Sequence, residues 1–320
     1  MRILVTGGAG YIGSIAAEAL VEEGFEVSVL DDLSSGIISK IPKEARFIQG
    51  SLLEKQKVLD ALEGCDAVLH FAGKSLVGES VTNPELYQEI NVEGSRTLLS
   101  QMRLKEIRKL VFSSSAATYG NSEKSPISER AETFPTNPYG ATKLQIEGLI
   151  DYEAKNYGLC AISLRYFNVA GAKRTKTGWL FEEHDPETHL IPNVLTSSKT
   201  NPVKIFGTDW PTWDGTCIRD YVHVVDLIGA HLKALNFLAK PGHEIFNIGS
   251  GSGYSVRDVL GAAIKVTGIS IPSENAQRRM GDPAVLVADV SKARDVLNWI
   301  PKKSLTEMVA DTWLAQNTHS

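Results

Sequence analysis

The segment RILVTGGAGYIG, residues 2–13, decides the fold of this chain. Its first five residues form an apolar run typical of a buried strand, and a helical pattern follows the glycines at positions 7, 10 and 13. Glycines at this spacing permit a tight turn, let the backbone approach a diphosphate closely and let helix and strand pack together. The N-terminus of the helix adds free N–H groups and the positive end of its dipole. The segment therefore predicts a dinucleotide-binding βαβ unit.

The same alternation of short apolar runs and longer amphipathic stretches continues through the first half of the chain. The expected strands are RILVT, EVSVL, ARFIQ, DAVLHF, KLVFSS and CAISLRYF, and the expected helices lie near residues 11–23, 54–63, 83–102 and 138–157. Strands that alternate with helices in this way are typical of a parallel sheet covered on both faces. We therefore predict an α/β protein with a Rossmann-type doubly wound parallel sheet.

A change of composition near Asn168 marks the expected domain boundary. The segment KRTKTGWLFEEHDPETHLIP, residues 173–192, carries few β-branched residues and many polar and turn residues. Residues 1–168 are expected to form the dinucleotide-binding domain, and residues 169–320 a smaller mixed α/β substrate domain. Segments near residues 215–248 are expected to cross back into the first domain.

Composition excludes several classes of function. The 320 residues carry a net charge of −5 with acidic and basic residues interspersed, which disfavours a nucleic-acid partner. Cys65, Cys160 and Cys217 show no disulfide or zinc-ligand spacing, so we expect neither a disulfide framework nor a metal site. The N-terminus enters a strand pattern directly, and no apolar run approaches membrane-spanning length. A cytoplasmic protein without a membrane anchor is expected.

Two carboxylates follow the second expected strand. Asp31 and Asp32 stand close to the usual distance of roughly 20 residues beyond a dinucleotide glycine loop. A carboxylate there accepts hydrogen bonds from an adenosine ribose and repels a 2′-phosphate, so the expected cofactor is NAD rather than NADP. The alternative is that the two aspartates form a solvated turn before LSSG.

Two further motifs could carry catalytic groups. In NPYGATK, Pro138 at a helix start places Tyr139 and Lys143 on one helix face, where an ammonium can favour the phenolate of its neighbour. Such a pair, taken alone, is more often two surface neighbours. The strand KLVF ends in three hydroxyls, FSSSAATYG, which form either a serine-rich turn or a hydroxyl presented to a ligand.

Taken together, the glycine loop, Ser115 and the Tyr139/Lys143 pair resemble the extended short-chain dehydrogenase/reductase superfamily. Within it, the chain closely resembles the UDP-glucose 4-epimerase family from residue 1 to about residue 313. The matching segments are GGAGYIGS, HFAG, LVGES, FSSSAATYG, NPYGATK, LRYFNVAGA, PETHLIP, GTCIRDYVHV and RRMGDPA. The resemblance implies reversible C4 epimerisation of UDP-glucose and UDP-galactose through a 4-keto intermediate, with tightly bound NAD, in a homodimer.

The resemblance also implies roles for individual residues. Tyr139 would be the base, Ser115 would hydrogen-bond the same sugar oxygen, and Lys143 would tune Tyr139 and bind the cofactor ribose. The implied cofactor-binding residues are Gly7, Gly10, Tyr11, Ile12, Gly13, Asp31, Asp32, Leu33, Ser34, Ser35, Ser51, Leu52, Phe71, Ala72, Gly73, Lys74, Ser75, Asn91, Ser113, Tyr139, Lys143 and Phe167. The implied substrate-binding residues are Ser115, Tyr139, Asn168, His189, Leu190, Lys204, Ile205, Phe206, Arg219, Tyr221, Arg279, Asp282 and Leu286.

Alternatives remain for the substrate and for the type of function. Leu286 has intermediate size at a position that, in the family, helps decide whether N-acetylated sugars fit, and UDP-glucuronate or a UDP-pentose are further candidate substrates. Dehydration is disfavoured, because Ala116 and Ala117 stand where dehydratases of the superfamily carry an Asp-Glu pair. A non-catalytic NAD-binding regulator is the distant alternative.

Two further features are expected to be structural. The loop GSGSGYS, residues 249–255, could be a second phosphate loop, but Ser255 and Asp258 indicate a helix cap. His223 is also expected to be structural.

Overall fold

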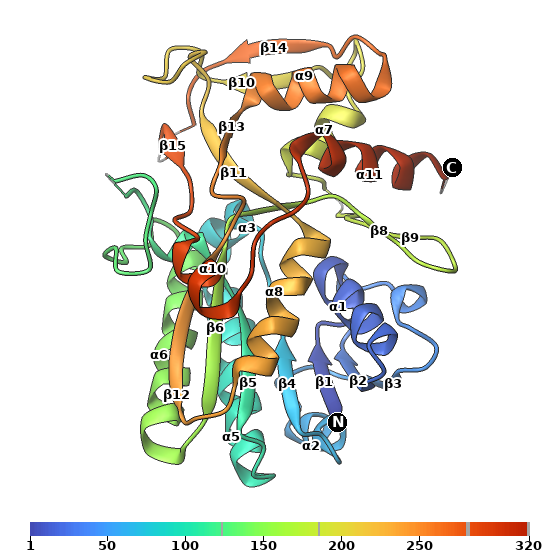
Figure 1. The fold of residues 1–320 in the computed structure, drawn as a ribbon, viewed down its shortest axis with the longest axis vertical. Coiled ribbons are helices and arrows are strands. Elements are labelled where there is room, and N and C mark those ends of the chain that lie inside the picture. Colours follow the sequence, from blue (N-terminus) through green and yellow to red (C-terminus); the bar gives the residue numbers. More distant parts are fainter. Residues whose placement is uncertain (123, 185, 280–281, 319–320) are drawn as a thin grey trace.

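The computed structural model describes residues 1–122, 124–184, 186–279 and 282–318. In this part of the chain the largest sheet has seven strands, all parallel, in the order β12-β6-β5-β4-β1-β2-β3 (Figure 1). The strands are β1 (Arg2–Thr6), β2 (Glu26–Asp31), β3 (Arg46–Gln49), β4 (Ala67–His70), β5 (Lys109–Ser115), β6 (Cys160–Tyr166) and β12 (Gly242–Ile248). This is the predicted Rossmann-type sheet.

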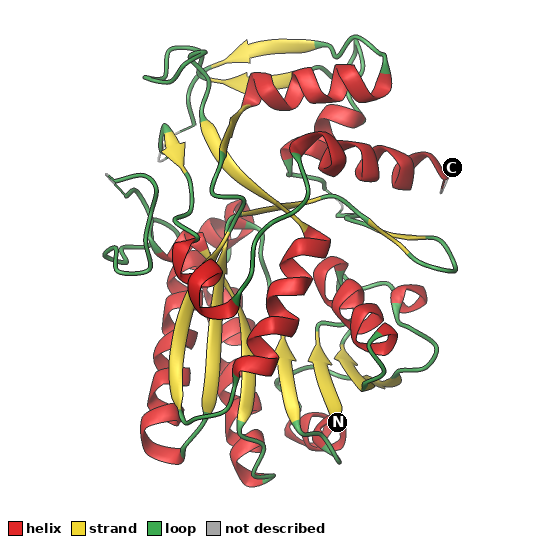
Figure 2. Ribbon diagram, in the orientation of Figure 1, coloured by secondary structure: helices red, strands yellow, loops and turns green. Residues whose placement is uncertain are grey.

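Helices cover both faces of this sheet (Figure 2). Ile3 and Val5 of β1 belong to one hydrophobic core, shared with α1 (Tyr11–Glu22) and α8 (Val224–Phe237). Leu4 between them belongs to a second core, shared with α2 (Lys55–Leu62), α5 (Gly94–Leu104) and α6 (Pro138–Tyr157). Successive side chains of a strand point to opposite faces, so an unbroken apolar strand requires a cover on each side. The doubly wound architecture follows from that requirement.

The helix predicted for residues 83–102 is interrupted. The structure has α4 (Pro84–Tyr87), a π-helical segment (Gln88–Glu93) and α5, and it adds α3 (Val77–Thr82), which the sequence pattern did not indicate. A π-helical turn carries one extra residue and occurs frequently at functional sites. It contains Asn91, whose amide exchanges hydrogen bonds with the main chain of Lys74. The interruption therefore serves a contact that apolar periodicity cannot reveal.

The later part of the chain forms a smaller lobe and also extends the large sheet (Figure 1). β12 pairs in parallel with β6, and α8 packs against α1. In the smaller lobe, β11 (Ile218–His223) pairs with β7 (Asn168–Ala170), β13 (Gly253–Ser255) and β15 (Val285–Leu286). The remaining strands there are β8 (Lys173–Arg174), β9 (Trp179–Leu180), β10 (Val203–Phe206) and β14 (Ser273–Ala276), and the helices are α7 (Leu190–Leu195), α9 (Val256–Thr267) and α11 (Leu305–Thr318). α10 (Ser291–Leu297) packs instead against β12 and α8, beside the large sheet.

The glycine-rich loop GSGSGYS is built around a buried carboxylate. Asp220 accepts hydrogen bonds from the backbone N–H groups of Ser250 (2.6 Å), Gly251 (3.1 Å) and Ala288 (3.0 Å). Ser255 then begins α9 with a complete capping box to Asp258. The backbone groups that could have held a phosphate already hold an aspartate, which confirms that the loop is a structural turn and helix cap.

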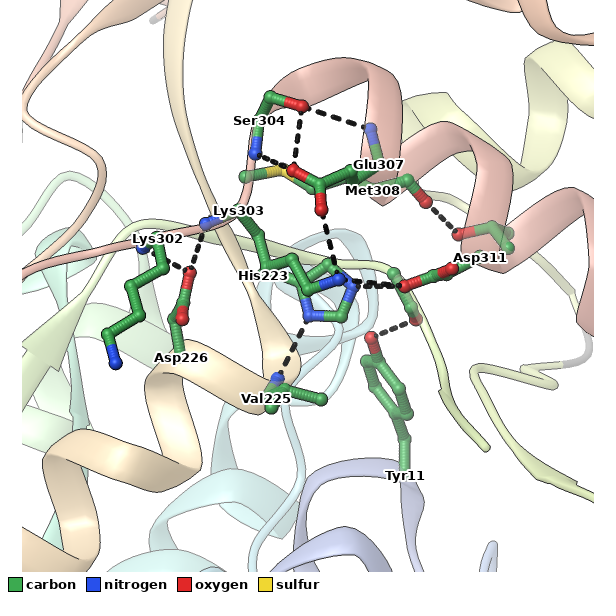
Figure 3. A network of polar contacts seen from close by, with 12 residues as sticks. Tyr11, His223, Val225, Asp226, Lys302, Lys303, Ser304, Glu307, Met308 and Asp311 are labelled. Atoms are coloured by element: carbon green, nitrogen blue, oxygen red, sulfur yellow. Dashed lines mark hydrogen bonds and ion pairs between the residues drawn. The ribbon is translucent and has the colours of Figure 1, made fainter. Parts of the chain in front are cut away.

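His223 joins the C-terminal helix to the rest of the molecule (Figure 3). Its Nδ1 accepts a hydrogen bond from the N–H of Val225 (3.1 Å), so the proton is on Nε2, which donates to Asp311 of α11 (3.1 Å). The Tyr11 hydroxyl of α1 donates to the carbonyl of Gly171 (2.6 Å) close by. With both ring nitrogens satisfied and no exposed surface, His223 has a structural role, as predicted.

No helix among the described residues combines the length and the apolar composition that crossing a membrane requires.

Candidate active site

A cavity of about 570 Å³ lies at the carboxyl ends of the large sheet's strands. This edge is where open α/β sheets bind their ligands. Most of the predicted cofactor residues line the cavity, namely Gly7, Gly10, Tyr11, Ile12, Gly13, Asp31, Asp32, Ser34, Ser35, Ser51, Leu52, Phe71, Ala72, Gly73, Lys74, Ser75, Ser113, Tyr139, Lys143 and Phe167. Ser115, Asn168, His189, Arg219, Asp282 and Leu286 of the predicted substrate residues line it as well.

The glycine loop forms a cradle that side chains would fill. A Cβ atom at Gly13 would lie 2.0 Å from the carbonyl oxygen of Gly7, and one at Gly7 would lie 2.7 Å from the backbone nitrogen of Ala72. Gly7 also has a φ of +69°, which favours glycine. The N-cap residue of α1 is Gly10, which has no side chain to cap the helix, so the first N–H groups of α1 remain free for a ligand in the cradle. These features fit the diphosphate of a dinucleotide.

The two aspartates after β2 differ in their surroundings. Asp31 is buried and accepts hydrogen bonds from the N–H groups of Ala9 and Leu33, both at 2.9 Å. Burial raises the pKa of Asp31, and the two N–H groups oppose that shift. Asp32 is exposed and accepts one hydrogen bond, from the N–H of Ser34. Both carboxylates retain lone pairs toward the cavity, which suits a ribose diol.

A buried polar network supports the wall after β4. His70 contacts the Thr6 hydroxyl through Nδ1 (2.7 Å) and the Ser95 hydroxyl through Nε2 (2.9 Å). Burial, with a contribution from the charge of Lys143, lowers the pKa of His70 to about 3. Ser95 donates in turn to the carbonyl of Asn91, whose side chain holds Lys74. Asn91 itself does not line the cavity. It acts on the cavity by holding Lys74, which does line it.

The start of α6 lies unusually close to the end of β5. Asn137 caps the helix by accepting from the N–H of Gly140 (2.9 Å), and Pro138 is its first residue. A Cβ atom at Gly140 would lie 2.4 Å from the carbonyl oxygen of Ala117, so only glycine permits this approach. The approach brings the Tyr139 phenol next to the Ser115 hydroxyl, whose hydrogen-bonding acts on the pKa of the phenol. Burial raises the pKa of Tyr139, and the Ser115 hydrogen bond opposes that shift.

Lys143 lies one helical turn beyond Tyr139 and is buried. Its Nζ donates to the carbonyl of Ser113 (2.8 Å) and lies 5.8 Å from the centroid of the Tyr139 ring. Burial lowers the pKa of Lys143 to about 8, although the charge of Glu147 opposes the shift. The side chain is thus positively charged at neutral pH and placed beside the phenol.

The three serines of β5 have separate partners. Ser113 forms a hydrogen bond with the Tyr166 hydroxyl, and Ser114 donates to the Glu147 carboxylate (2.6 Å). Ser115 is the partly exposed member that faces Tyr139. Glu147 is also held by the Arg165 guanidinium through two hydrogen bonds (2.9 and 2.5 Å). Ser114 is therefore structural, as its position in the strand predicts.

Several implied residues do not line this cavity. They are Leu33, Asn91, Leu190, Lys204, Ile205, Phe206, Tyr221 and Arg279. The Arg279 guanidinium carbon lies 3.9 Å from the Phe206 ring centroid, so these two residues stay together in the smaller lobe. Met280 and Gly281 of the RRMGDPA motif, and Asp185 of the EEHDPETH segment, lie outside the described residues.

Other cavity residues escaped the sequence analysis. They include Glu79, Asn121, Thr136, Asn137, Tyr166, Glu182 and His184. Tyr166 is the last residue of β6 and lies within the matching segment LRYFNVAGA, but the resemblance assigned it no role. Glu182 and His184 stand in the segment expected to be loop, where the acidic run EEHDPETH was the available signal. Loop residues reach a site through tertiary contacts, which spacing along the chain does not indicate.

Comparisons with known proteins agree with this geometry. A model of the NAD dependent epimerase/dehydratase family matches residues 3–249. The chain is 48% identical to a UDP-glucose 4-epimerase of Corynebacterium glutamicum, covering 98% of this chain and 95% of the relative.

Two solved structures are similar over almost their full lengths. A UDP-glucose 4-epimerase from Brucella ovis in complex with NAD gives a TM-score of 0.93 at 39% identity, covering 98% of this chain and 97% of that one. A UDP-glucose 4-epimerase from Thermotoga maritima with UDP-glucose gives a TM-score of 0.88 at 32% identity, covering 100% and 99%. The fold and the family expected from the glycine loop are confirmed, and the chain belongs to the NAD dependent epimerase/dehydratase family.

Proposed function

We propose that this chain is an isomerase that interconverts UDP-glucose and UDP-galactose at C4, through a 4-keto intermediate, with tightly bound NAD. The observation that carries the proposal is the Ser115–Tyr139–Lys143 constellation, which opens into one cavity with the glycine cradle. The relatives named above as UDP-glucose 4-epimerases support the same activity. The hydroxyl, phenol and ammonium groups suit proton transfer at a sugar alcohol.

The cofactor site draws on both ends of the first βαβ unit. The glycine cradle and the α1 N-terminus would hold the diphosphate, the carboxylates of Asp31 and Asp32 the adenosine ribose, and Lys143 the other ribose. When bound, NAD supplies an acceptor for the C4 hydride and, once reduced, a donor for its return. No net redox change results, so no added oxidant is needed.

Proton transfer is assigned to Tyr139. Because burial raises the pKa of Tyr139, its phenolate must be stabilised by neighbours, and Ser115 and Lys143 are those neighbours. Tyr139 accepts the proton of the C4 hydroxyl, and Ser115 hydrogen-bonds the same oxygen or relays its proton. Both groups then return the proton to the C4 oxygen, whichever face of the sugar receives the hydrogen at carbon.

The nucleotide-sugar site is assigned to the smaller lobe. Arg219 lines the cavity there, donates to the carbonyls of Ile218 and Pro283 (2.9 Å each) and lies 3.5 Å from Asp282. A planar guanidinium suits phosphate oxygens. The full proposed substrate set is Ser115, Tyr139, Asn168, His189, Leu190, Lys204, Ile205, Phe206, Arg219, Tyr221, Arg279, Asp282 and Leu286. Residues 1–168 with the returning segments would form the NAD-binding domain, and residues 169–320 the nucleotide-sugar domain.

A cytoplasmic homodimer completes the proposal. The exposed outer faces of α5 and α6 carry large apolar side chains: Leu104 is 68% exposed, Tyr152 55% and Tyr157 45%. Two helices with such a face suit an isologous interface, in which each helix pair packs against its copy.

Other UDP-sugars are the second candidate substrates. Leu286 lines the cavity and packs against the cluster that contains Ala116 and Phe167, so its size limits one wall of the pocket. Assays with N-acetylated hexoses, UDP-glucuronate and UDP-pentoses decide which of these sugars the pocket accepts beside this leucine. A purely NAD-binding regulator is disfavoured, because such a protein has no need for the complete Ser115–Tyr139–Lys143 set.

The purified chain is expected to convert UDP-galactose to UDP-glucose without added NAD. Tightly held cofactor supplies the redox chemistry internally, so product should form at a rate independent of NAD in solution. Parallel incubations with UDP-GalNAc, UDP-glucuronate and UDP-arabinose, separated by anion-exchange chromatography, define the substrate range. Binding of UDP-galactose without any conversion would refute the proposed function.

Replacement Tyr139→Phe is expected to lower kcat by about 10²–10⁴-fold. The change removes the proton acceptor and very little volume, so bound NAD, measured by absorbance after denaturation, and the KM for UDP-galactose should change little. A variant with unaltered kcat would rule out Tyr139 as the base.

Replacements at two adjacent serines separate catalysis from stability. Ser115→Ala should lower kcat by about 10²-fold or more and lower the free energy of unfolding by about 1 kcal/mol, because the Ser115 hydroxyl also accepts a hydrogen bond from the N–H of Ala117. Ser114→Ala should keep kcat within a few-fold, but lower the free energy of unfolding by about 1.5–3 kcal/mol, because a hydrogen bond to the buried Glu147 carboxylate is lost. Steady-state kinetics and urea unfolding of both variants check the pair. The reverse pattern would contradict the assignment of the two hydroxyls.

A further inference from the structure

The cavity contains a cluster of metal-ligand side chains that neither the proton-transfer constellation nor the glycine cradle uses. Glu182, His184 and His189 each place one ligand atom within 4.8 Å of the other two. We infer that these three residues form a binding site for a divalent transition-metal ion of the Zn²⁺ class. The cysteine and histidine spacings of the chain predicted no metal site, and the spacing E-x-H-x₄-H of these three residues is not among the common zinc-ligand patterns.

The distances within the cluster suit a shared ion. Glu182 places one carboxylate oxygen 2.6 Å from Nδ1 of His184 and the other 3.3 Å from Nδ1 of His189. Ligand atoms around a tetrahedral zinc lie about 3.3 Å apart, given bonds of about 2.0 Å. The imidazole rings of the two histidines stack with centroids 5.6 Å apart. Small side-chain rotations therefore suffice to bring the three ligand atoms to one ion.

One atom of the cluster lacks a hydrogen-bond partner. Nδ1 of His184 is fully buried and makes no hydrogen bond, although the Glu182 oxygen lies 2.6 Å away. The two atoms are close enough for a hydrogen bond, but their orientation does not allow one. Two lone-pair atoms that approach each other without a hydrogen bond between them are what two ligands of a common cation present. A buried nitrogen without a partner is unfavourable, and a bound metal ion would supply that partner.

Neighbouring residues hold the ligands in place. Glu187 accepts a hydrogen bond from Nδ1 of His189 (2.8 Å) and from the N–H groups of Thr188 and His189 (2.7 Å each). Because Nδ1 of His189 donates to Glu187, the ring nitrogen that His189 would offer to an ion is Nε2, as in other metal sites where a carboxylate orients an imidazole. On the other side of the loop, Lys40 donates to the carbonyl of Phe181 (3.0 Å) and pairs with Glu183. The loop is thus anchored immediately before the first ligand.

The negative charge of Glu182 indicates what the ion would do in the cavity. Glu182 is only 8% exposed and faces the cavity that, on the proposed function, receives two diphosphate-bearing ligands. A buried carboxylate beside phosphate oxygens is unfavourable unless a cation lies between them. Three protein ligands leave one tetrahedral position open, and the cluster lines the cavity. The open position would therefore take a phosphate oxygen of the UDP moiety; this assignment of the fourth ligand rests on the proposed function.

The site is tested first by metal binding alone. Tag-free full-length protein is stripped with dipicolinate, dialysed and titrated with Co²⁺, whose visible absorption reports tetrahedral coordination, and then with Zn²⁺ as competitor. We expect about one Co²⁺ per chain, displaced by Zn²⁺. The variants Glu182→Gln and His184→Asn should each weaken Co²⁺ binding at least about tenfold. Glu183→Gln, in the same loop but paired with Lys40, should bind as the unaltered chain does.

Circular dichroism and thermal melting establish that each variant is folded. Because Glu182→Gln and His184→Asn change different ligands, a loss of Co²⁺ binding in both is not an effect of one particular substitution. No Co²⁺ spectrum in the unaltered chain, or equal binding by Glu182→Gln, His184→Asn and Glu183→Gln, would overturn the metal site. The phosphate contact is tested by calorimetry with UDP in the presence and absence of Zn²⁺. Zn²⁺ should tighten UDP binding in the unaltered chain and not in Glu182→Gln, whereas equal affinities would overturn the phosphate contact. A failure of UDP to bind under either condition would count against the proposed function, while the Co²⁺ titration still decides the metal site.

Discussion

The ammonium of Lys143 is buried between β5 and α6, and the rest of the active site is arranged around it. A lysine that is 5% exposed is costly, and burial accordingly lowers its pKa. The carbonyl of Ser113 accepts a hydrogen bond from its Nζ, and Glu147 lies one turn further along the helix. Arg165 and Ser114 in turn bind Glu147 from β6 and β5. This chain of charges fixes α6 against the sheet and, with it, the Tyr139 phenol beside Ser115.

The parallel sheet explains why groups from distant parts of the sequence meet. The glycine loop follows β1, residues 71–74 follow β4, and the three serines are the last residues of β5. The carboxyl ends of these strands share one edge of the sheet. Two close approaches complete the site: Gly13 against Gly7, and Gly140 against Ala117. At both positions a side chain would collide with a backbone oxygen. The cradle and the start of α6 therefore depend on glycine for space as much as for flexibility.

The sequence could predict what is local and periodic. The parallel sheet, α1 and α6 follow from apolar runs, glycines and the Pro138 helix start, and the cap at Ser255 follows from its spacing to Asp258. It could not predict the π-helical turn at Asn91, because that turn serves a contact with Lys74. It also missed Glu182 and His184, which approach His189 only once β9 and its loop are placed. Site residues that belong to a sequence motif could be predicted, whereas residues that reach the site only through tertiary contacts could not.

The central claim is that one cavity removes hydrogen from a sugar carbon and returns it to the same carbon, with the Tyr139 phenol and its neighbours handling only the hydroxyl proton. Isotope labelling at C4 tests this most directly. UDP-galactose carrying deuterium at C4 is incubated in ordinary water with the purified chain, and the UDP-glucose formed is analysed by mass spectrometry and NMR. The account predicts that deuterium is retained at C4 of the product. Loss of the label to solvent would mean that the C4 hydrogen leaves as a proton, and would contradict it.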